Sequence, residues 1–324
     1  MRKFLFVIVS GIILSSCIKS ADYNRKSLIC EKVVEEFNDS MFVPPTVKCM
    51  DYKNGKLYIS DYREGMIVLD ENLNIFQTYA NHGPGPGETV GAAHFFVEEN
   101  DSVYLLNEGK NSVELYVEGK NFQTISFPEK IPLTYSTRFF VENNNIFHTT
   151  IVKEGPVVVF GKNEEEVRFL GKYMQHDDMT LPRHLTRHTV KGDDCYFVIG
   201  SVLPALQKYS FDGNLLDEVD LSIIPEIERM VKKYKRTAQD PSSYFSIVQD
   251  ACFYGGKLYM LIATDIDGFY CNLICSIDFI YDKGIKTDFY VLPNTVYTSF
   301  CVGDKNVLYA FNPKDSSIEV FKMD

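Results

Sequence analysis

One pattern recurs along the chain and limits the possible folds more than any other feature. A tyrosine is followed after three residues by Asp or Asn, after six more by Ile or Val, and after two more by Leu or Val. The tyrosines that begin the three copies are Tyr58, Tyr104 and Tyr309. A short apolar strand that ends in a turn-forming residue, followed by an alternating strand, predicts a β-hairpin. Three copies of one hairpin predict an internal structural repeat.

Weaker copies lie between the strong ones and give the repeat a regular length. Each copy contains an aromatic residue at the same point, and these markers are Tyr58, Tyr104, Phe147, Tyr196, Tyr259 and Tyr309. Successive markers are 43 to 63 residues apart, which leaves room for four strands in each copy. Six four-stranded units of this length predict an all-β fold, a six-bladed β-propeller.

The longest interval between markers contains a segment with a helical pattern. Residues 225–236 place their apolar side chains on one face, as an amphipathic helix does. These side chains are Ile227, Met230, Val231 and Tyr234. The basic face from Lys232 to Arg236 either lies in solvent, which we favour, or contacts lipid phosphates near a membrane anchor. We therefore expect one short helix inserted near residues 225–236 of the propeller.

The two ends of the chain predict how the ring closes. The last unit reaches Phe321 with three residues left, which is one strand short of a full blade. The segment Lys32–Phe42 precedes the first unit and can supply that strand. Because this pairing removes two exposed sheet edges, we expect residues 30–324 to form one closed propeller.

The first 16 residues have the anatomy of a secretory signal peptide. Two basic residues precede an apolar run, Phe4–Leu14, that is too short to cross a membrane, which needs about 20 residues in a helix. The run ends in Leu-Ser-Ser followed by Cys17, which resembles the lipobox of bacterial lipoproteins. The resemblance implies that Cys17 carries a lipid and that residues 17–29 form a lipidated, flexible tether. An ordinary signal peptide with a chance cysteine is the alternative.

These features predict a cell-envelope protein attached to the membrane through the lipid on Cys17. The residues after Cys17 lack the Asp that resembles an inner-membrane retention signal, so we favour an outer-membrane anchor facing the periplasm. The net charge of −11, from 33 Lys plus Arg against 44 Asp plus Glu, argues against nucleic acid as a partner. Seven further cysteines are an odd number without Cys-x-x-Cys, which argues against a redox motif or a zinc knuckle.

A loop rich in glycine and proline lies between the first and second units. Its residues are Gly83, Pro84, Gly85, Pro86, Gly87 and Glu88. It resembles the Gly-x-Gly-Pro-Gly-Glu turn of the TolB-like six-bladed propeller lipoproteins of Gram-negative anaerobes. The resemblance implies a six-bladed propeller of unassigned ligand and brings no catalytic site. We interpret the loop as a rigid structural turn; an anion cradle is the alternative, but the Lys-Ser/Thr of a phosphate loop is missing.

The first strand of each propeller blade lines the central channel, and the repeat register places polar residues there. The candidate ligand-binding residues at the channel mouth are His94, Arg138, His184, Arg187, His188, Tyr244 and Tyr297. Arg and His favour an anionic or hydroxyl-rich ligand, and Tyr adds stacking and hydrogen bonds. The alternative is that these side chains satisfy one another in a plugged channel.

Two of these histidines also have the spacing of a helical metal pair. His184 and His188 are four residues apart, and His176 lies nearby. Arginines interleaved with them would repel a cation, and the repeat register places the pair at the start of a strand, where such residues lie far apart. We therefore expect no metal site, and nothing in the sequence calls for a cofactor.

Motifs of known enzymes are missing from the chain. Neither Gly-x-Ser-x-Gly nor His-Glu-x-x-His occurs, so no catalytic residue is predicted. We therefore expect a lipid-anchored, non-catalytic propeller that binds an unknown ligand or an envelope protein. The first alternative is an envelope hydrolase or lyase that acts on carbohydrate or peptide at the channel mouth. The second is a scaffold whose blade edges recruit partner proteins.

Overall fold

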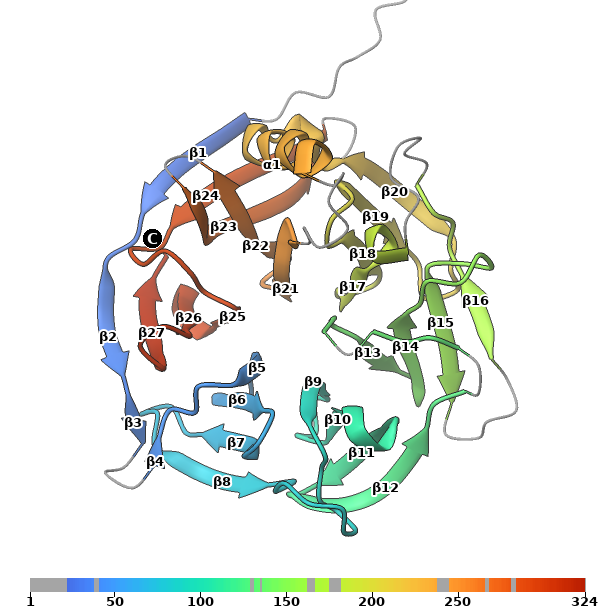
Figure 1. Cartoon of the computed structure of the whole chain (residues 1–324), viewed down its shortest axis with the longest axis vertical. Helices are drawn as coiled ribbons and strands as arrows, with labels where there is room; N and C mark the ends of the chain where they lie inside the picture. Colours follow the sequence, from blue (N-terminus) through green and yellow to red (C-terminus); the bar gives the residue numbers. More distant parts are fainter. Residues whose placement is uncertain are drawn as a thin grey trace, which may run out of the picture.

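Six sheets surround a central axis like the blades of a propeller (Figure 1). The computed structural model describes residues 22–37, 41–128, 131–134, 136–161, 167–174, 182–237, 245–265, 268–280 and 284–323. Strands that follow one another within a blade pair antiparallel, and the first strand of each blade lies innermost. The predicted six-bladed architecture with four-stranded blades is confirmed.

The first three blades each consist of four consecutive strands. Blade 1 contains β5 (Val47–Lys53), β6 (Lys56–Asp61), β7 (Gly65–Leu69) and β8 (Ile75–Tyr79). Blade 2 contains β9 (Ala92–Val97), β10 (Val103–Asn107), β11 (Ser112–Val117) and β12 (Lys120–Ser126). Blade 3 contains β13 (Phe140–Glu142), β14 (Asn145–Thr149), β15 (Val157–Gly161) and β16 (Arg168–Leu170).

Strands from the N-terminal end of the chain join the last two of the remaining three blades. Blade 4 contains β17 (Arg187–Lys191), β18 (Tyr196–Gly200), β19 (Ala205–Tyr209) and β20 (Leu215–Asp220). Blade 5 contains β21 (Val248–Tyr254), β22 (Lys257–Asp265), β23 (Phe269–Ile280), β24 (Gly284–Val291) and the outer strand β1 (Asp22–Ser27). Blade 6 contains β25 (Ser299–Gly303), β26 (Val307–Asn312), β27 (Ser317–Lys322) and β2 (Cys30–Val34).

The other short elements lie in the connections. The 3-10 turns are η1 (Glu108–Lys110), η2 (Pro182–Leu185), η3 (Leu221–Ile223) and η4 (Asp304–Asn306). The turn between the first and second strands of blade 1 is Asn54-Gly55, with φ of 51° and 75°. A two-residue turn with both φ values positive matches the right-handed twist of the strands, so the Asn-Gly pair fixes this hairpin.

The repeated aromatic residue packs between blades. Tyr58 of β6, for example, lies in one buried cluster with Phe95 and Val97 of blade 2. In blade 4 the predicted marker is wrong by one residue: Phe197 faces blade 5, and Tyr196 faces blade 3. The connection between β17 and β18 spans residues 192–195, whereas blades 1, 3 and 5 have two-residue connections. The same distance from the end of the first strand therefore reaches a residue on the opposite face in blade 4.

The ring closes through β2, which pairs antiparallel with β27, the last strand of the chain. Closure by the N-terminal segment was expected from Lys32–Phe42, but the strand spans Cys30–Val34. The remainder of the expected segment forms a separate ribbon of β3 (Glu36–Phe37) and β4 (Met41–Phe42). The predicted boundary of the closing strand was wrong because β2 and the β3–β4 ribbon have similar strand-forming sequences, and only their pairing partners distinguish them.

The expected flexible tether over residues 17–29 is wrong from Asp22 onward. Strand β1 pairs in parallel with β24 and covers the outer edge of blade 5. Its side chains from Asn24 to Ser27 are exposed, so backbone hydrogen bonds rather than apolar burial hold it in place. Because periodicity of burial is the usual strand signal, the polar sequence concealed this strand. Cys17 lies outside the described residues.

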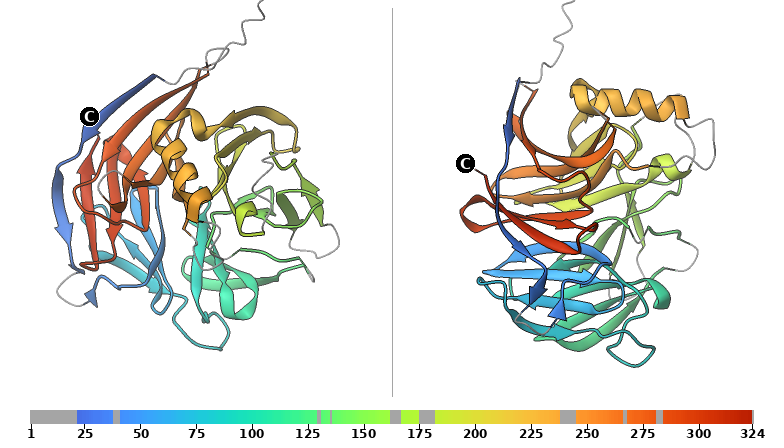
Figure 2. Two further views of the ribbon diagram at one scale, coloured as in Figure 1. Left: turned by 45° about the horizontal axis from the view of Figure 1, so that its top comes forward. Right: turned by 60° about the vertical axis from the view of Figure 1, so that its left-hand side comes forward.

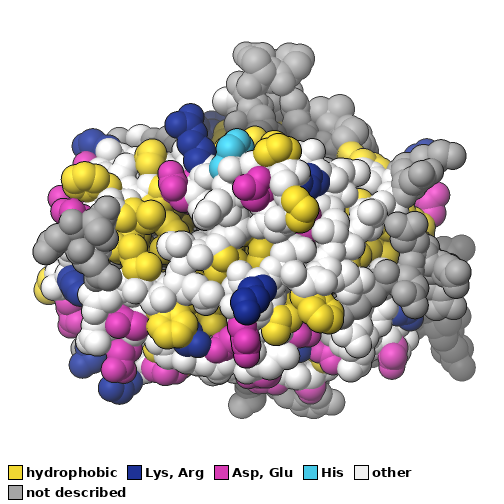
Figure 3. Space-filling view, turned by 90° about the horizontal axis from the view of Figure 1, so that it is seen from below, with side chains coloured by type: hydrophobic (Ala, Val, Ile, Leu, Met, Phe, Trp, Pro, Cys, Tyr) yellow, Lys and Arg dark blue, Asp and Glu magenta, His cyan; other side chains and the backbone are white. Residues whose placement is uncertain are grey.

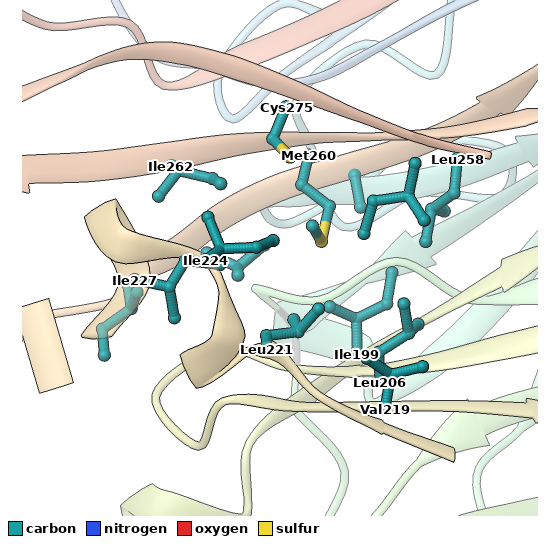
Figure 4. Close-up of a cluster of buried hydrophobic side chains, with 14 of the residues drawn as sticks. Ile199, Leu206, Val219, Leu221, Ile224, Ile227, Leu258, Met260, Ile262 and Cys275 are labelled. Carbon is teal, nitrogen blue, oxygen red and sulfur yellow. The ribbon is translucent and has the colours of Figure 1, made fainter. Parts of the chain in front are cut away.

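The inserted helix α1 (Pro225–Thr237) occupies the predicted position. Its apolar face joins a buried cluster between blades 4 and 5, which contains Ile227 together with Leu221 and Ile262 (Figure 4). Proline at the first helical position is compatible with the helix because its missing N–H would have no partner there. Within the described residues, no helix has both the length and the apolar character needed to cross a bilayer.

The cysteines within the described residues are all free thiols, and all but Cys30 are buried. They are Cys30, Cys49, Cys195, Cys252, Cys271, Cys275 and Cys301.

On the rim near β8 and β12, hydrophobic side chains are scattered among acidic and basic ones (Figure 3). Phe76 and Phe122 are the large exposed examples there, at 59% and 70% exposure.

Candidate functional site

A buried ion pair crosses the axis of the ring. Arg138 lies two residues before β13 in blade 3, and its Nε lies 2.7 Å from Oδ1 of Asp250 on β21 in blade 5. Its Nη2 donates to Oδ2 of Asp250 at 2.9 Å, so the pair is bidentate. The same Nη2 donates to the carbonyls of Met50 in blade 1 at 2.9 Å and Phe300 in blade 6 at 3.1 Å. One guanidinium therefore joins four blades and plugs the channel.

The carboxylate of Asp250 accepts further hydrogen bonds from its own side of the ring. Oδ2 accepts from the hydroxyl of Ser299 at 2.9 Å and the amide of Phe300 at 3.2 Å, and Oδ1 accepts from the amide of Ala251 at 2.9 Å. Burial alone would raise the pKa of Asp250, but the charge and hydrogen bonds of Arg138 lower it. Asp250 is therefore ionised at neutral pH and locked in place.

His188 on β17 supports the plug from blade 4. Its Nδ1 accepts a hydrogen bond of 3.3 Å from the backbone amide of Arg138, and the amide of Thr189 donates to the Arg138 carbonyl at 3.0 Å. Burial lowers the pKa of His188 to about 4, so the ring is neutral at pH 7 and can accept this hydrogen bond. The predicted residues Arg138 and His188 therefore meet at the axis as parts of a plug.

The other predicted residues that the structure describes do not converge on one channel mouth. Arg187 is buried, with its guanidinium 4.7 Å from the ring of Tyr173 and its Nη1 donating to a backbone carbonyl at 2.6 Å. His184 packs edge-on against Tyr234 of α1 at 5.5 Å between ring centroids. Arg187 therefore packs toward Tyr173, which follows β16, and His184 packs toward α1, so neither has a described contact with the Arg138–Asp250 pair.

Tyr297 and His94 lie elsewhere. Tyr297 donates its hydroxyl to Glu319 at 2.6 Å between blades 5 and 6. His94 on β9 lines a cavity of about 310 Å³ at the end of the axis where the first strands begin. Tyr244 lies outside the described residues, as does His176 of the considered metal site. Among the residues the structure describes, no three His, Cys, Asp or Glu side chains are grouped to hold a metal ion.

A larger cavity lies at the opposite end of the axis, where the first strands finish. It has a volume of about 810 Å³, and we call it the basin. All six first strands run in the same direction, so the basin and the smaller cavity lie on opposite faces of the ring. Arg138 and Asp51 line the basin, so the plug belongs to its wall.

The mouth of the basin is braced across blade boundaries. Asp304 of blade 6 accepts hydrogen bonds from the hydroxyls of Tyr254 at 2.8 Å and Tyr52 at 3.3 Å, which come from blades 5 and 1. Lys191 forms a 2.6 Å ion pair with Glu142 across blades 4 and 3. These contacts hold the rim of the basin in one shape without a ligand.

The basin is acidic and aromatic. Its carboxylates come from Asp51, Glu98, Glu99, Glu142, Asp193 and Asp304, against the ammonium groups of Lys53 and Lys191. Arg138 adds no net charge because Asp250 neutralises it. Partly exposed rings line the same walls: Tyr52, Phe96, Phe253 and Tyr254. Cationic rather than anionic ligands suit this lining, which reverses the preference expected from the arginines and histidines.

The glycine- and proline-rich loop binds its own carboxylate. Oε2 of Glu88 accepts from the amide of Gly85 at 2.8 Å, and the ammonium of Lys110 donates to the carbonyls of Gly85 and Glu88 at 2.8 Å each. Gly87 has a φ of 70°, which favours glycine. An external anion would have to displace Glu88, so these contacts agree with a structural turn.

Sequence reasoning missed the acidic members of the site. Asp250 is the only charged residue of strand β21, and a carboxylate there signals a buried partner, because an unpaired buried charge is costly. Asp304 lies in the connection after β25, and Tyr254 is the last residue of the first strand β21. The register placed candidates on the first strands but gave no reason to compare the connections at their ends.

Solved structures resemble the chain over nearly its whole length, although no protein-family model and no curated protein sequence matches it. A member of the DUF4221 family from Bacteroides vulgatus has a TM-score of 0.59 and 11% identity, covering 92% of this chain and 97% of that chain. A Bacteroides fragilis protein whose name describes it as exported has a TM-score of 0.57 and 13% identity, covering 93% and 99%. A streptogramin B lyase has a TM-score of 0.53 and 10% identity, covering 90% and 98%. At these identities the similarity shows the shared fold alone.

Proposed function

We propose that this propeller is a non-catalytic binding protein of the cell envelope, anchored by a lipid on Cys17, and that the basin holds its ligand. The observation that carries the proposal is the basin itself: a cavity of about 810 Å³ closed below by the Arg138–Asp250 plug and braced at its mouth. A preformed concave site of this volume is typical of ligand-binding sites. Because its shape does not depend on a ligand, little ordering free energy is lost on binding.

The chemistry of the basin supports a cationic ligand. Lysine and arginine side chains of a partner protein would meet carboxylates such as Asp51 and Asp193 on the walls. Faces of Tyr52 and Phe253 can contact a guanidinium or the apolar stem of such a side chain. We therefore propose a basic, exposed segment of an envelope protein as the ligand.

Binding fits the buried groups better than catalysis does. General acid–base catalysis needs a group that changes protonation near the working pH and reaches a substrate. Arg138 and Asp250 are both held in their charged forms by each other, and His188 uses its Nδ1 to accept from the backbone. The groups nearest the axis are thus committed to structure.

Attachment to the envelope rests on the N-terminal sequence. The leader, the Leu-Ser-Ser-Cys17 box and the resemblance to TolB-like propeller lipoproteins support an outer-membrane anchor facing the periplasm. The exported protein of similar fold from Bacteroides fragilis agrees with this location. Mass spectrometry of the mature N-terminus tests it: a diacylated or triacylated Cys17 is expected, and a chain starting elsewhere without lipid would contradict it.

Peptide binding tests the basin. Isothermal titration of an Arg- and Lys-rich peptide should give saturable, salt-sensitive binding that an acidic peptide of equal length does not show. Asp193→Asn removes one basin charge and should weaken binding about twofold to tenfold. Asp212→Asn, an exposed site in blade 4 outside the basin, is the matched control and should leave affinity unchanged. Equal weakening by both variants would show a general charge effect and refute the site.

A further inference from the structure

The helix α1 lies where the chain enters the fold. Strand β1 begins at Asp22, and Nη1 of Arg25 on this strand lies 3.8 Å from Oε1 of Glu226 on α1. Both elements belong to the blade 5 side of the ring, and α1 packs against β22 of that blade. The views in Figure 1 and Figure 2 agree that the start of β1 and α1 occupy the same end of the molecule.

The exposed surface of α1 is basic. Its 13 residues include five cations, Arg229, Lys232, Lys233, Lys235 and Arg236, against two acids, Glu226 and Glu228. The apolar residues face the core, so the cations lie on the outside, where the side chains of Arg229 and Lys232 are 50% and 60% exposed. Arg25 and Lys26 add two exposed cations on β1.

The length of chain before β1 limits how far α1 can be from a bilayer. Cys17 precedes Asp22 by five residues, which span at most about 18 Å when fully extended. A lipid on Cys17 therefore brings the bilayer within reach of α1, and this step rests on the proposed anchor. Anionic headgroups attract basic segments over about a Debye length of 8–10 Å.

We propose that the outer face of α1 and the start of β1 form a membrane-contact surface for anionic phospholipid headgroups. The propeller then stands with the blade 5 edge of the ring toward the bilayer. Its axis lies roughly parallel to the membrane, and the basin opens sideways. A basic segment of a second membrane-attached protein could enter the basin from this direction.

Ion pairs within the surface do not remove its charge. Lys232 contacts Glu228, and Lys233 lies 2.7 Å from Asp265. Exposed pairs of this kind are weak and exchange partners readily, so the ammonium groups are available to phosphates. With five cations and two acids, α1 keeps a net positive charge against a protein of net charge −11. The concentration of cations at the point of membrane attachment, on an otherwise acidic chain, favours lipid as the occupant.

The chain contains no tryptophan, so single reporters can be introduced. Thr237→Trp places a reporter at the end of α1, and Phe122→Trp places one on β12 in blade 2, where the native side chain is 70% exposed. Each mature, lipidated protein is mixed with vesicles of brominated phosphatidylcholine, with or without phosphatidylglycerol. Quenching of the reporter measures its closeness to the bilayer.

We expect strong quenching of Thr237→Trp in phosphatidylglycerol vesicles and little quenching of Phe122→Trp. Adding Lys232→Gln, Lys235→Gln and Arg236→Gln to Thr237→Trp should reduce the quenching. The phosphatidylglycerol concentration that gives half-maximal quenching should rise by more than tenfold, since each cation contributes about fivefold to the membrane affinity. The matched control is Lys120→Gln, Arg168→Gln and Lys305→Gln, which removes equal charge from exposed sites on blades 2, 3 and 6. This control should behave like the parent.

Equal quenching of the two reporters, or a similar effect of the two triple variants, would overturn the proposal. Failure of the anchor is distinguishable: the mature chain would lack lipid by mass and would not remain with pure phosphatidylcholine vesicles. In that case, quenching of Thr237→Trp that depends on phosphatidylglycerol and is lost at high salt would still support the surface, and its absence would refute it. Thermal unfolding of each variant verifies the fold.

Discussion

Replacing Arg138 by Met removes the cation at the centre of the ring and leaves Asp250 buried without its counterion. The side chain of Asp250 is 1% exposed, so water cannot replace the two lost hydrogen bonds. Removing one partner of a buried pair typically lowers the free energy of unfolding by about 3–5 kcal/mol. The carbonyls of Met50 and Phe300 lose their donor as well, so we expect the upper part of this range in urea unfolding at pH 7.

The pH dependence of this loss has a definite sign. In the wild type Arg138 holds the pKa of Asp250 below its ordinary value. The pair therefore stabilises the fold at pH values above the unfolded pKa of about 3.9, and this contribution to stability is lost as pH falls through the folded pKa. In Arg138→Met, burial dominates and raises that pKa. The difference in the free energy of unfolding between wild type and Arg138→Met should therefore shrink as pH falls from 7 toward 4.5.

A second variant separates the charge from the packing. Arg138→Met combined with Asp250→Leu should recover a large part of the lost stability, because no unpaired charge remains. Arg168→Met on exposed β16 is the control and should change the free energy of unfolding by less than about 0.5 kcal/mol. A loss of less than about 1 kcal/mol in Arg138→Met, the value of a surface pair, would contradict this prediction, as would a double variant as unstable as the two single losses combined.

Three other variants test separate parts of the structure. Phe197→Ala should lower the unfolding free energy by about 3–5 kcal/mol, while exposed Phe122→Ala should change it by less than about 0.5 kcal/mol; similar thermal melts would contradict the blade 4 register. Glu88→Ala should speed protease cleavage between residues 81 and 89, and an unchanged rate would exclude its role in the loop. Burial lowers the pKa of His148 to about 4, so this histidine should reduce the unfolding free energy by about 3 kcal/mol as pH falls from 6.5 to 4, and His148→Gln should remove that part of the slope.

Much of the fold was predictable from the sequence because one hairpin repeats with a recognisable aromatic residue. The blade count, the four-stranded blades and the helix α1 all follow from spacing and periodicity. Spacing could not detect strand β1, since its side chains are exposed and its hydrogen bonds come from β24. Nor could it detect the shift at Tyr196, because the length of a turn decides which face a residue takes.

The candidate site was less predictable because its contacts join distant blades. Arg138 and Asp250 are 112 residues apart, and no local pattern connects them. Placing residues on first strands was enough to bring Arg138 and His188 to the axis, but not to reveal that they plug it. Asp304 and Tyr254 meet only because the ring brings blades 5 and 6 side by side.

A crystal structure of the mature chain with a bound basic peptide shows directly whether the basin holds the ligand. We expect a lysine or arginine side chain of the peptide inside the basin, next to Tyr52 and Tyr254 and within ion-pair distance of Asp51, with the Arg138–Asp250 plug intact beneath it. A peptide bound at the opposite cavity beside His94, or an axis opened by separation of Arg138 from Asp250, would contradict it.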